Sequence, residues 1–250
     1  CPPLAKSLRS GRVVTPLLQI LVTKVAFLAD PSPTELELAR EMASTLLLSG
    51  LDSTEYGSLV SDLEDLMGTQ ISVFTLPWSL DLAELLALNV CPGPEERLRF
   101  VLRVVEGARR LAHRMSPSDM LVVEQLCRDY AIDCPLEIRV GKNLQVDGSS
   151  NALSGKQVAI YTLMEPAGHR AAILLHQLCP TVRVELNSDH ECTKALINLA
   201  HRADLFVFAW KSSKHQAFYC IKEHRDAGRV FLQPLGKGSS SIVRAILDCA

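Results

Sequence analysis

The feature that most constrains the fold is an alternation of short apolar runs with amphipathic segments along the last hundred residues. The apolar runs predict strands at 157–163, 182–186, 204–210 and 229–233. The segments that follow them predict helices at 169–179, 190–202, 215–227 and from Ser239 onward. Strands that alternate with helices pair in parallel through right-handed crossovers. The sequence therefore predicts an α/β fold, with a Rossmann-like or flavodoxin-like open parallel sheet ordered 2-1-3-4 and helices on both faces.

The first part of the chain has a different pattern, in which helical periodicity dominates. The first predicted helix begins near Pro33-Thr34, and its apolar residues line one face: Leu36, Ala39, Ala43, Leu46 and Leu47. Further helices are predicted at 54–67, 79–89, 95–115 and 117–131, with a short hairpin at 137–146. The length of 250 residues suits one large domain or two small ones. We predict a mainly helical domain at 1–146, a small, polar linker at 147–156 and an α/β domain at 157–250.

The most apolar N-terminal run, residues 13–29, does not predict a membrane span. Pro16 and Lys24 interrupt it, and it falls short of the roughly 20 apolar residues that a spanning helix needs. No positively charged leader precedes it, so a signal peptide is not predicted. Because the chain begins Cys1-Pro-Pro without an initiator Met, we expect a processed product or one piece of a larger protein.

Eight cysteines are scattered along the chain without a CxxC pair. A chain of this length has enough core to fold without disulfides. We therefore predict that the cysteines are reduced and mostly buried, which favours a cytoplasmic location. They are Cys1, Cys91, Cys127, Cys134, Cys179, Cys192, Cys220 and Cys249.

Charge changes sign near the predicted linker. Residues 1–150 carry 14 Lys and Arg against 20 Asp and Glu, whereas residues 151–250 carry 12 against 8. The net charges are therefore −6 and +4, so the C-terminal part favours anions. Because the asymmetry is small and aromatic residues make up only 5% of the chain, the pattern favours a small phosphorylated ligand and leaves nucleic acid open.

Three stretches of the C-terminal part resemble a bacterial family of Rossmann-like domains of unknown function. They are Leu153-Ser-Gly-Lys-Gln-Val-Ala-Ile, Ala203-Asp-Leu-Phe-Val-Phe-Ala-Trp-Lys-Ser-Ser-Lys-His215 and Gly236-Lys-Gly-Ser-Ser-Ser-Ile-Val-Arg-Ala-Ile-Leu. The resemblance covers about 153–247. It implies a hydroxyl-rich turn before His215, a helix that carries Lys222, and a Gly-Ser-Ser turn into the last helix. It also implies a place in a bacterial multi-gene system such as phage defence.

The chain departs from that family after the first strand. The family has a Gly-rich turn there, whereas this chain has Met164-Glu-Pro-Ala-Gly-His169. A phosphate-binding role of this first loop therefore does not carry over.

An anion site is predicted at the carboxyl edge of the sheet. Ligands of open parallel sheets bind where the strand order reverses, here between the first and third strands. Helix N-terminal amides and basic side chains converge at this rim. The alternative is that the serines merely cap the last helix and the lysines are solvated. The predicted ligand-binding residues are Lys211, Ser213, Lys214, His215, Lys237, Gly238, Ser239 and Ser240.

His215 and Glu165 are the candidates for acid–base chemistry. A helix N-terminus favours a neutral imidazole, which suits His215 to hydrogen bonding or to a role as base. Its own loop lacks an acid, so Glu165 is the candidate partner, and Asp204 lies at the wrong end of its strand. The plainer interpretation of His215 is a structural hydrogen bond in the loop.

Neither a metal site nor a cofactor is predicted. Asp189-His-Glu-Cys192 contains metal-ligand residue types, but no second cluster lies at a suitable spacing and successive residues seldom converge on one ion. Gly148 to Gln157 resembles a phosphate loop only superficially, because Ser150 replaces its first Gly and Gln157 its Ser or Thr, and it precedes a strand. No GxSxG elbow exists. A series of arginines on the helix at 95–115 favours a solvated face over docking to an acidic partner: Arg97, Arg99, Arg103, Arg109, Arg110 and Arg114.

Two functional classes remain. The first is a non-catalytic sensor or interaction module, which binds a nucleotide or other phosphorylated ligand and couples to a protein partner or to the rest of a larger chain. The second is part of an enzyme that acts on nucleotides or nucleic acid with His215, Lys211 and Glu165. An enzyme requires His215 within hydrogen-bond reach of a carboxylate, whereas a sensor requires only anion donors. A pure protein-docking scaffold is the third possibility.

Overall fold

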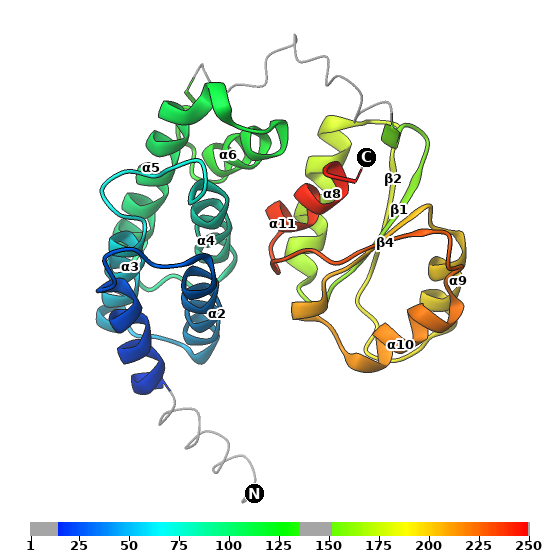
Figure 1. Ribbon diagram of the computed structural model, residues 1–250, viewed down its shortest axis with the longest axis horizontal. Coiled ribbons are helices and arrows are strands. Elements are labelled where there is room, and N and C mark those ends of the chain that lie inside the picture. Colours follow the sequence, from blue (N-terminus) through cyan, green and yellow to red (C-terminus); the bar gives the residue numbers. More distant parts are fainter. Residues whose placement is uncertain (1–14, 136–151, 250) are drawn as a thin grey trace, which may run out of the picture. The chain divides into compact units, whose positions relative to one another are not determined.

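The computed structural model describes residues 15–135 and 152–249, and they form two compact units (Figure 1). One unit comprises Cys1–Met115 and Leu126–Glu137, and the other comprises Ser116–Gln125 and Ile138–Ala250. The predicted hairpin at 137–146 and most of the predicted linker at 147–156 lie outside the described residues. The linker boundary therefore stays a prediction.

The first unit is helical, as predicted. Residues 15–26 form a helix. The later elements are α2 (Pro33–Ser49), α3 (Ser53–Leu66), α4 (Leu76–Leu88), α5 (Pro94–Leu111), the short 3-10 helix η1 (Ala112–Arg114) and α6 (Pro117–Asp129), which the two units share. Helices α2 and α3 begin at capping boxes, which Ser32 forms with Glu35 and Asp52 forms with Glu55.

Buried aliphatic faces hold these helices together, and one buried side chain adds a polar link. The indole Nε1 of Trp78, in α4, donates a hydrogen bond of 2.7 Å to the carbonyl of Leu36, in α2. This bond satisfies the polar atom of a largely buried ring. It fixes α4 along α2 in a way that periodicity alone does not specify.

The arginines of α5 bind groups of their own unit. Arg99 pairs with Glu64 at 3.0 Å, and Arg109 and Arg110 pair with Glu106 at 2.8 and 3.1 Å. The guanidinium of Arg97 lies 5.4 Å from the centre of the Tyr130 ring. These contacts fit the predicted solvated face, and they add ion pairs that the sequence analysis did not predict.

The second unit is an α/β fold built on a four-stranded parallel sheet, which confirms the predicted fold class and strand order. The strands β1 (Gln157–Tyr161), β2 (Arg183–Asn187), β3 (Leu205–Phe208) and β4 (Val230–Leu232) lie in the order β2-β1-β3-β4. Val158 pairs with Leu205 and Tyr161 with Phe208, so β1 and β3 are neighbours as expected. The helices are α8 (Glu165–Leu178), α9 (Lys194–Arg202), α10 (His215–His224) and α11 (Ser239–Leu247), with the 3-10 helix η2 at Trp210–Ser212.

Helices cover both faces of this sheet (Figure 1). Helix α8 packs with α11 on one face, and α9 packs with α10 on the other. Successive strand residues point to opposite faces, and the aromatic positions of β1 and β3 face α9 and α10. The resulting core includes Tyr161, Phe206, Phe208, Leu196 and Ile221. Tyr161 stacks on Phe208 with 5.2 Å between ring centres.

The prediction that every cysteine is reduced is wrong for one pair. Cys192, in the loop before α9, forms a disulfide with Cys220 of α10. Their sequence separation of 28 leaves no local pattern to read, but packing of α9 against α10 brings their Cα atoms to 5.5 Å. Cys91, Cys127, Cys134, Cys179 and Cys249 are not disulfide-bonded.

Within residues 15–135 and 152–249, no helix combines the length and the apolarity that crossing a bilayer requires.

Candidate functional site

A hollow of about 430 Å³ lies at the carboxyl edge of the sheet, beyond the ends of β3 and β4. Its walls combine aromatic rings with groups that form hydrogen bonds. The lining residues are Phe208, Trp210, Ser213, His215, Phe218 and Gln233. Two of them, Ser213 and His215, belong to the predicted binding set.

The aromatic wall continues the core outward. Phe208 ends β3, and its ring centre lies 5.4 Å from that of Phe218 and 6.1 Å from that of Phe231. Trp210 follows in η2 and is half exposed. A ring that is buried on one side and open on the other offers a flat apolar face to a ligand. This face is the part of the hollow that the sequence analysis missed, because the aromatic run 204–210 also reads as a buried strand.

The hollow lies on the β3–β4 side and not at the predicted point between β1 and β3. The loops after β1 and β3 are tied together there: the amide of Leu163 donates to the carbonyl of Ser212 at 2.8 Å, and the hydroxyls of Thr162 and Ser212 hydrogen-bond at 2.8 Å. The amide of Met164 also donates to the Thr162 hydroxyl at 3.1 Å. These bonds join the two loops instead of letting them diverge.

Two lysines of the predicted set lie near each other beside this edge. Burial, and then the positive charge of Lys237, lower the pKa of Lys211 from its usual value. Burial is the larger cause of the shift, and the repulsion between the two ammonium groups is the smaller one. The Nζ of Lys211 also lies 5.4 Å from the centre of the Trp210 ring. A negative charge bound here would relieve the repulsion and favour both charged forms.

The residues that begin α10 are solvent-accessible. Lys214 is its N-cap and His215 its first residue, and both are exposed. The hydroxyl of Ser213 donates to the carbonyl of Trp210 at 2.7 Å and thereby shapes the loop. His215 therefore presents its ring both to solvent and to the hollow.

The turn into α11 differs from the expected open rim. Gly238 is the N-cap and is partly exposed, but Ser239 and Ser240 are fully buried. The amide of Gly236 donates to the Ser241 hydroxyl at 2.6 Å, which closes the turn from inside. In this conformation, Lys237 and Gly238 are the partly exposed residues at the start of α11.

The carboxylates considered for His215 have other partners. Glu165 begins α8 and accepts a hydrogen bond of 2.7 Å from the Ser188 hydroxyl, beyond β2. Asp204 accepts from the amide of Gln157 at 2.8 Å at the opposite end of the sheet. Glu165 and His215 follow β1 and β3 respectively, and no hydrogen bond joins them among the described residues. The geometry thus places hydrogen-bonding groups and aromatic faces around one hollow, with the ammonium group of Lys211 over its Trp210 ring.

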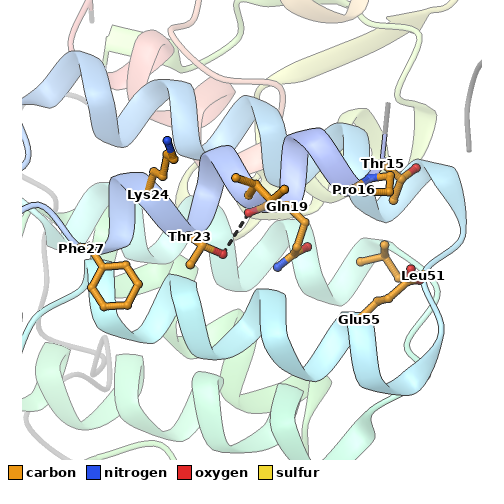
Figure 2. Close-up of a pocket in the computed structure, with 9 residues that line it drawn as sticks. Thr15, Pro16, Gln19, Thr23, Lys24, Phe27, Leu51 and Glu55 are labelled. Carbon is orange, nitrogen blue, oxygen red and sulfur yellow. Dashed lines mark hydrogen bonds between the residues drawn. The ribbon is translucent and has the colours of Figure 1, made fainter. Parts of the chain in front are cut away.

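A second hollow, of about 470 Å³, lies in the helical unit (Figure 2). Ile20 and Phe27 of the first segment and Leu51 before α3 give it apolar walls. Thr23 donates hydrogen bonds to the carbonyl of Gln19 at 3.0 Å and to Asp62 at 2.6 Å. The lining of this hollow begins at Thr15, the first residue that the structure describes.

The comparisons with known proteins give one match. A family model described as DpdD-like matches residues 4–245. The match includes the helical unit, upstream of the segment 153–247 in which the sequence resemblance was found. No curated protein and no solved structure matches.

Proposed function

Because this chain belongs to the DpdD-like family, we propose that it acts in a defence-associated system, as a module that binds a nucleotide or a related phosphorylated ligand. The binding site is the hollow at the carboxyl edge of the α/β unit. The helical unit couples the bound state to a protein partner or to the rest of a larger chain.

The observation that carries the proposal is the pairing of aromatic faces with positive charge. Trp210 and Phe218 line the hollow. The Nζ of Lys211 lies 5.4 Å from the centre of the Trp210 ring, and burial, followed by the charge of Lys237, lowers the pKa of Lys211. A nucleobase has a flat π-face that stacks on aromatic side chains, and its phosphates carry the charge that lysines attract. Neither a purely apolar nor a purely anionic ligand would use both features.

Hydrogen-bonding groups around the hollow orient the bound ligand. His215, Ser213 and the Gln233 amide stand around the aromatic wall and suit the polar edge of a base or a sugar hydroxyl. The volume of about 430 Å³ falls within the usual range of small-ligand pockets. We assign Lys211, Ser213, His215, Lys237 and Gly238 to binding, with Lys214 at the outer rim.

The alternative, an enzyme that uses His215 and Lys211, makes a different demand. Its base needs an orienting carboxylate, and Glu165 instead holds Ser188. We therefore favour binding without catalysis. Steady hydrolysis of a nucleotide that disappears in the His215→Ala variant would favour the enzyme.

Charge reversal at the two lysines tests the site. The Lys211→Glu, Lys237→Glu double variant is expected to lower the affinity for nucleoside phosphates at least about tenfold, because attraction becomes repulsion. The melting temperature should stay unchanged. Isothermal titration calorimetry measures the affinity, and Lys156→Glu with Lys194→Glu, both exposed elsewhere in the unit, is the matched control. If the wild-type protein gives no heat with any phosphorylated ligand, the protein-docking scaffold replaces the proposal.

A Trp210→Ala variant tests whether Trp210 contacts the base of the ligand and not its phosphate. Stacking of a base on an aromatic ring contributes about 1–3 kcal/mol, so nucleotide affinity should fall about 5- to 150-fold. Affinity for inorganic phosphate, which has no ring to stack, should not change. Equal loss for both ligands would show that Trp210 shapes the site and does not contact the base.

A further inference from the structure

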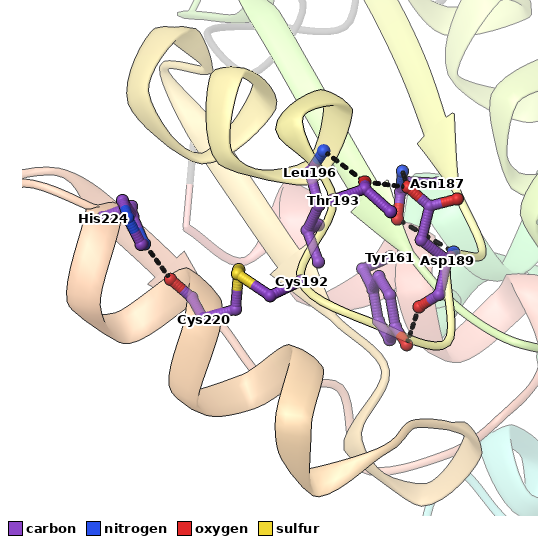
Figure 3. Close-up of a disulfide and its surroundings, with 8 residues drawn as sticks. All are labelled: Tyr161, Asn187, Asp189, Cys192, Thr193, Leu196, Cys220 and His224. Carbon is purple, nitrogen blue, oxygen red and sulfur yellow. Dashed lines mark hydrogen bonds between the residues drawn. A yellow bond between two sulfur atoms is a disulfide. The ribbon is translucent and has the colours of Figure 1, made fainter.

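The disulfide has a third metal-ligand side chain beside it. The two sulfur atoms of Cys192 and Cys220 and a ring nitrogen of His224 all lie within 4.8 Å of one another (Figure 3). Cys220 and His224 are four residues apart in α10, which places them on one face of the helix. Cys192 reaches them from the loop before α9. The stretch Asp189–Cys192 has no second group of metal-ligand residues near it in the sequence. The fold supplies one, because it brings Cys220 and His224 next to Cys192.

We propose that Cys192, Cys220 and His224 form a zinc site when the disulfide is reduced. Two thiolates and one imidazole are ligands that Zn²⁺ takes in proteins. In a tetrahedral site with ordinary Zn–S and Zn–N bonds the ligand atoms are roughly 3.5–3.8 Å apart. Once the sulfur–sulfur bond opens, rotation of the three side chains brings the sulfur and nitrogen atoms to these distances. Water, or the nearby ring of His201, completes the coordination.

The loop that carries Cys192 is held in place by its own hydrogen bonds (Figure 3). The Asp189 carboxylate accepts from the Thr193 hydroxyl and, at 2.9 Å, from the Asn187 amide. The buried Tyr161 hydroxyl donates to the carbonyl of Asp189 at 2.8 Å. Thr193 in turn caps α9 through the Leu196 amide at 3.1 Å. Reduction therefore leaves Cys192 opposite α10, so little ordering is needed for a metal to bind.

The exposure of the cluster and the orientation of the His224 ring also suit metal binding. Cys192 is exposed, His224 is partly exposed and Cys220 is buried, so the cluster is open on one side. Nδ1 of His224 donates to the carbonyl of Cys220 at 2.8 Å, which holds the ring beside the sulfurs. His201 lies edge-on to His224, with 5.9 Å between ring centres.

Reduction of the Cys192–Cys220 disulfide needs one co-reactant, a dithiol. A dithiol supplies two electrons and two protons, so the sulfur–sulfur bond breaks, two thiols form and the dithiol becomes a disulfide. Zn²⁺ then replaces the two thiol protons, which go to solvent, and the imidazole donates a lone pair. The cluster thus has an oxidised, metal-free state and a reduced, zinc-binding state.

The test is a metal titration of the full chain in both redox states. The protein is reduced with a phosphine, which takes oxygen from water to become its oxide, and is then titrated with Zn²⁺ against a chromophoric chelator. Co²⁺ serves as a second probe, because thiolate coordination gives charge-transfer absorption. We expect one ion per reduced chain and at least about 100-fold weaker binding to the oxidised chain.

Variants locate the site. Cys192→Ser, at an exposed position, is expected to lower the zinc affinity of the reduced chain at least about 100-fold, and His224→Ala at least about tenfold. Cys249→Ser and His176→Ala, exposed residues of the same types outside the cluster, should bind zinc as the wild type does. The proposal fails if the reduced chain takes up no stoichiometric zinc, or if Cys192→Ser keeps the wild-type affinity. Circular dichroism of each reduced variant verifies that its fold is retained.

Discussion

Replacement of Arg225 by methionine is expected to lower the free energy of unfolding of the α/β unit by about 3–5 kcal/mol. Arg225 follows α10 and is only 9% exposed. Its guanidinium donates to the carbonyls of Ala200 at 2.9 Å, Ala203 at 3.1 Å and Asp204 at 3.1 Å, and also to that of Val230. One side chain thus joins the end of α9 to the beginnings of β3 and β4.

The expected loss of stability in Arg225→Met comes mainly from the carbonyl groups that lose a hydrogen-bond donor. Methionine has nearly the same reach but no donor, so all four carbonyls lose the guanidinium, and that of Ala203 keeps only Arg229, at 3.2 Å. A buried carbonyl left without a partner costs about 1–3 kcal/mol. The guanidinium also lies 5.5 Å from the centre of the Phe206 ring, a contact that methionine keeps only as packing. Burial, and then the charge of Arg229, lower the pKa of Arg225, but arginine remains charged.

Hydrogen exchange of the β1 and β3 amides in denaturant measures this loss for the α/β unit by itself. Arg202→Met is the matched control, because Arg202 makes an exposed ion pair with Glu185 and should cost less than about 1 kcal/mol. Arg225→Lys should also destabilise, since one ammonium cannot span four carbonyls. A loss below about 1 kcal/mol for Arg225→Met would mean that water replaces the guanidinium at those carbonyls.

Loss of the disulfide is the second large effect that we expect. In the chain-entropy description, a cross-link that closes a loop of 28 residues stabilises the native state by about 3–4 kcal/mol. Cys192 is exposed, so Cys192→Ser removes the cross-link with little loss of packing. We therefore expect the variant to unfold at lower denaturant concentration than the oxidised wild type.

The same denaturant titration under reducing conditions isolates the cross-link. Reduced, metal-free wild type and Cys192→Ser should then unfold together, because both lack the bond. Cys249→Ser should match the wild type within about 0.5 kcal/mol in the oxidised state. A Cys192→Ser protein as stable as the oxidised wild type would show that the pair is not bonded in solution. Zinc should restabilise reduced wild type but not Cys192→Ser, by linkage.

Sequence periodicity predicted the elements well but missed some of their ends. Helix α8 begins at Glu165 and not at 169, because Pro166 suits the first turn and the loop folds back onto Thr162. Helix α9 begins at Lys194 and not at 190, because Thr193 is its N-cap and Asp189 holds Thr193. In both cases a hydrogen bond within the loop that leads into the helix sets the start.

The candidate site was predicted in part. Lys211 and Lys237 interact beside the carboxyl edge, and Ser213 and His215 line its hollow. Phe218 and Gln233 were missed, since nothing local distinguishes a pocket-lining ring or amide from any other. The burial of Ser239 and Ser240 was missed as well, because it depends on a hydrogen bond between Gly236 and Ser241 that closes the turn.

The sequence by itself determined the α/β class, the strand order and the helical character of the first unit. These follow from periodicity, which acts over a few residues, and from the handedness of crossovers, which is general. Only the tertiary structure decided that Cys192 meets Cys220 and His224, and that the hollow opens beside β3 and β4. The physical reason is that such contacts join loops distant along the chain. Their proximity depends on how helices pack on the sheet and on which loops hydrogen-bond to each other, and no short-range pattern encodes either.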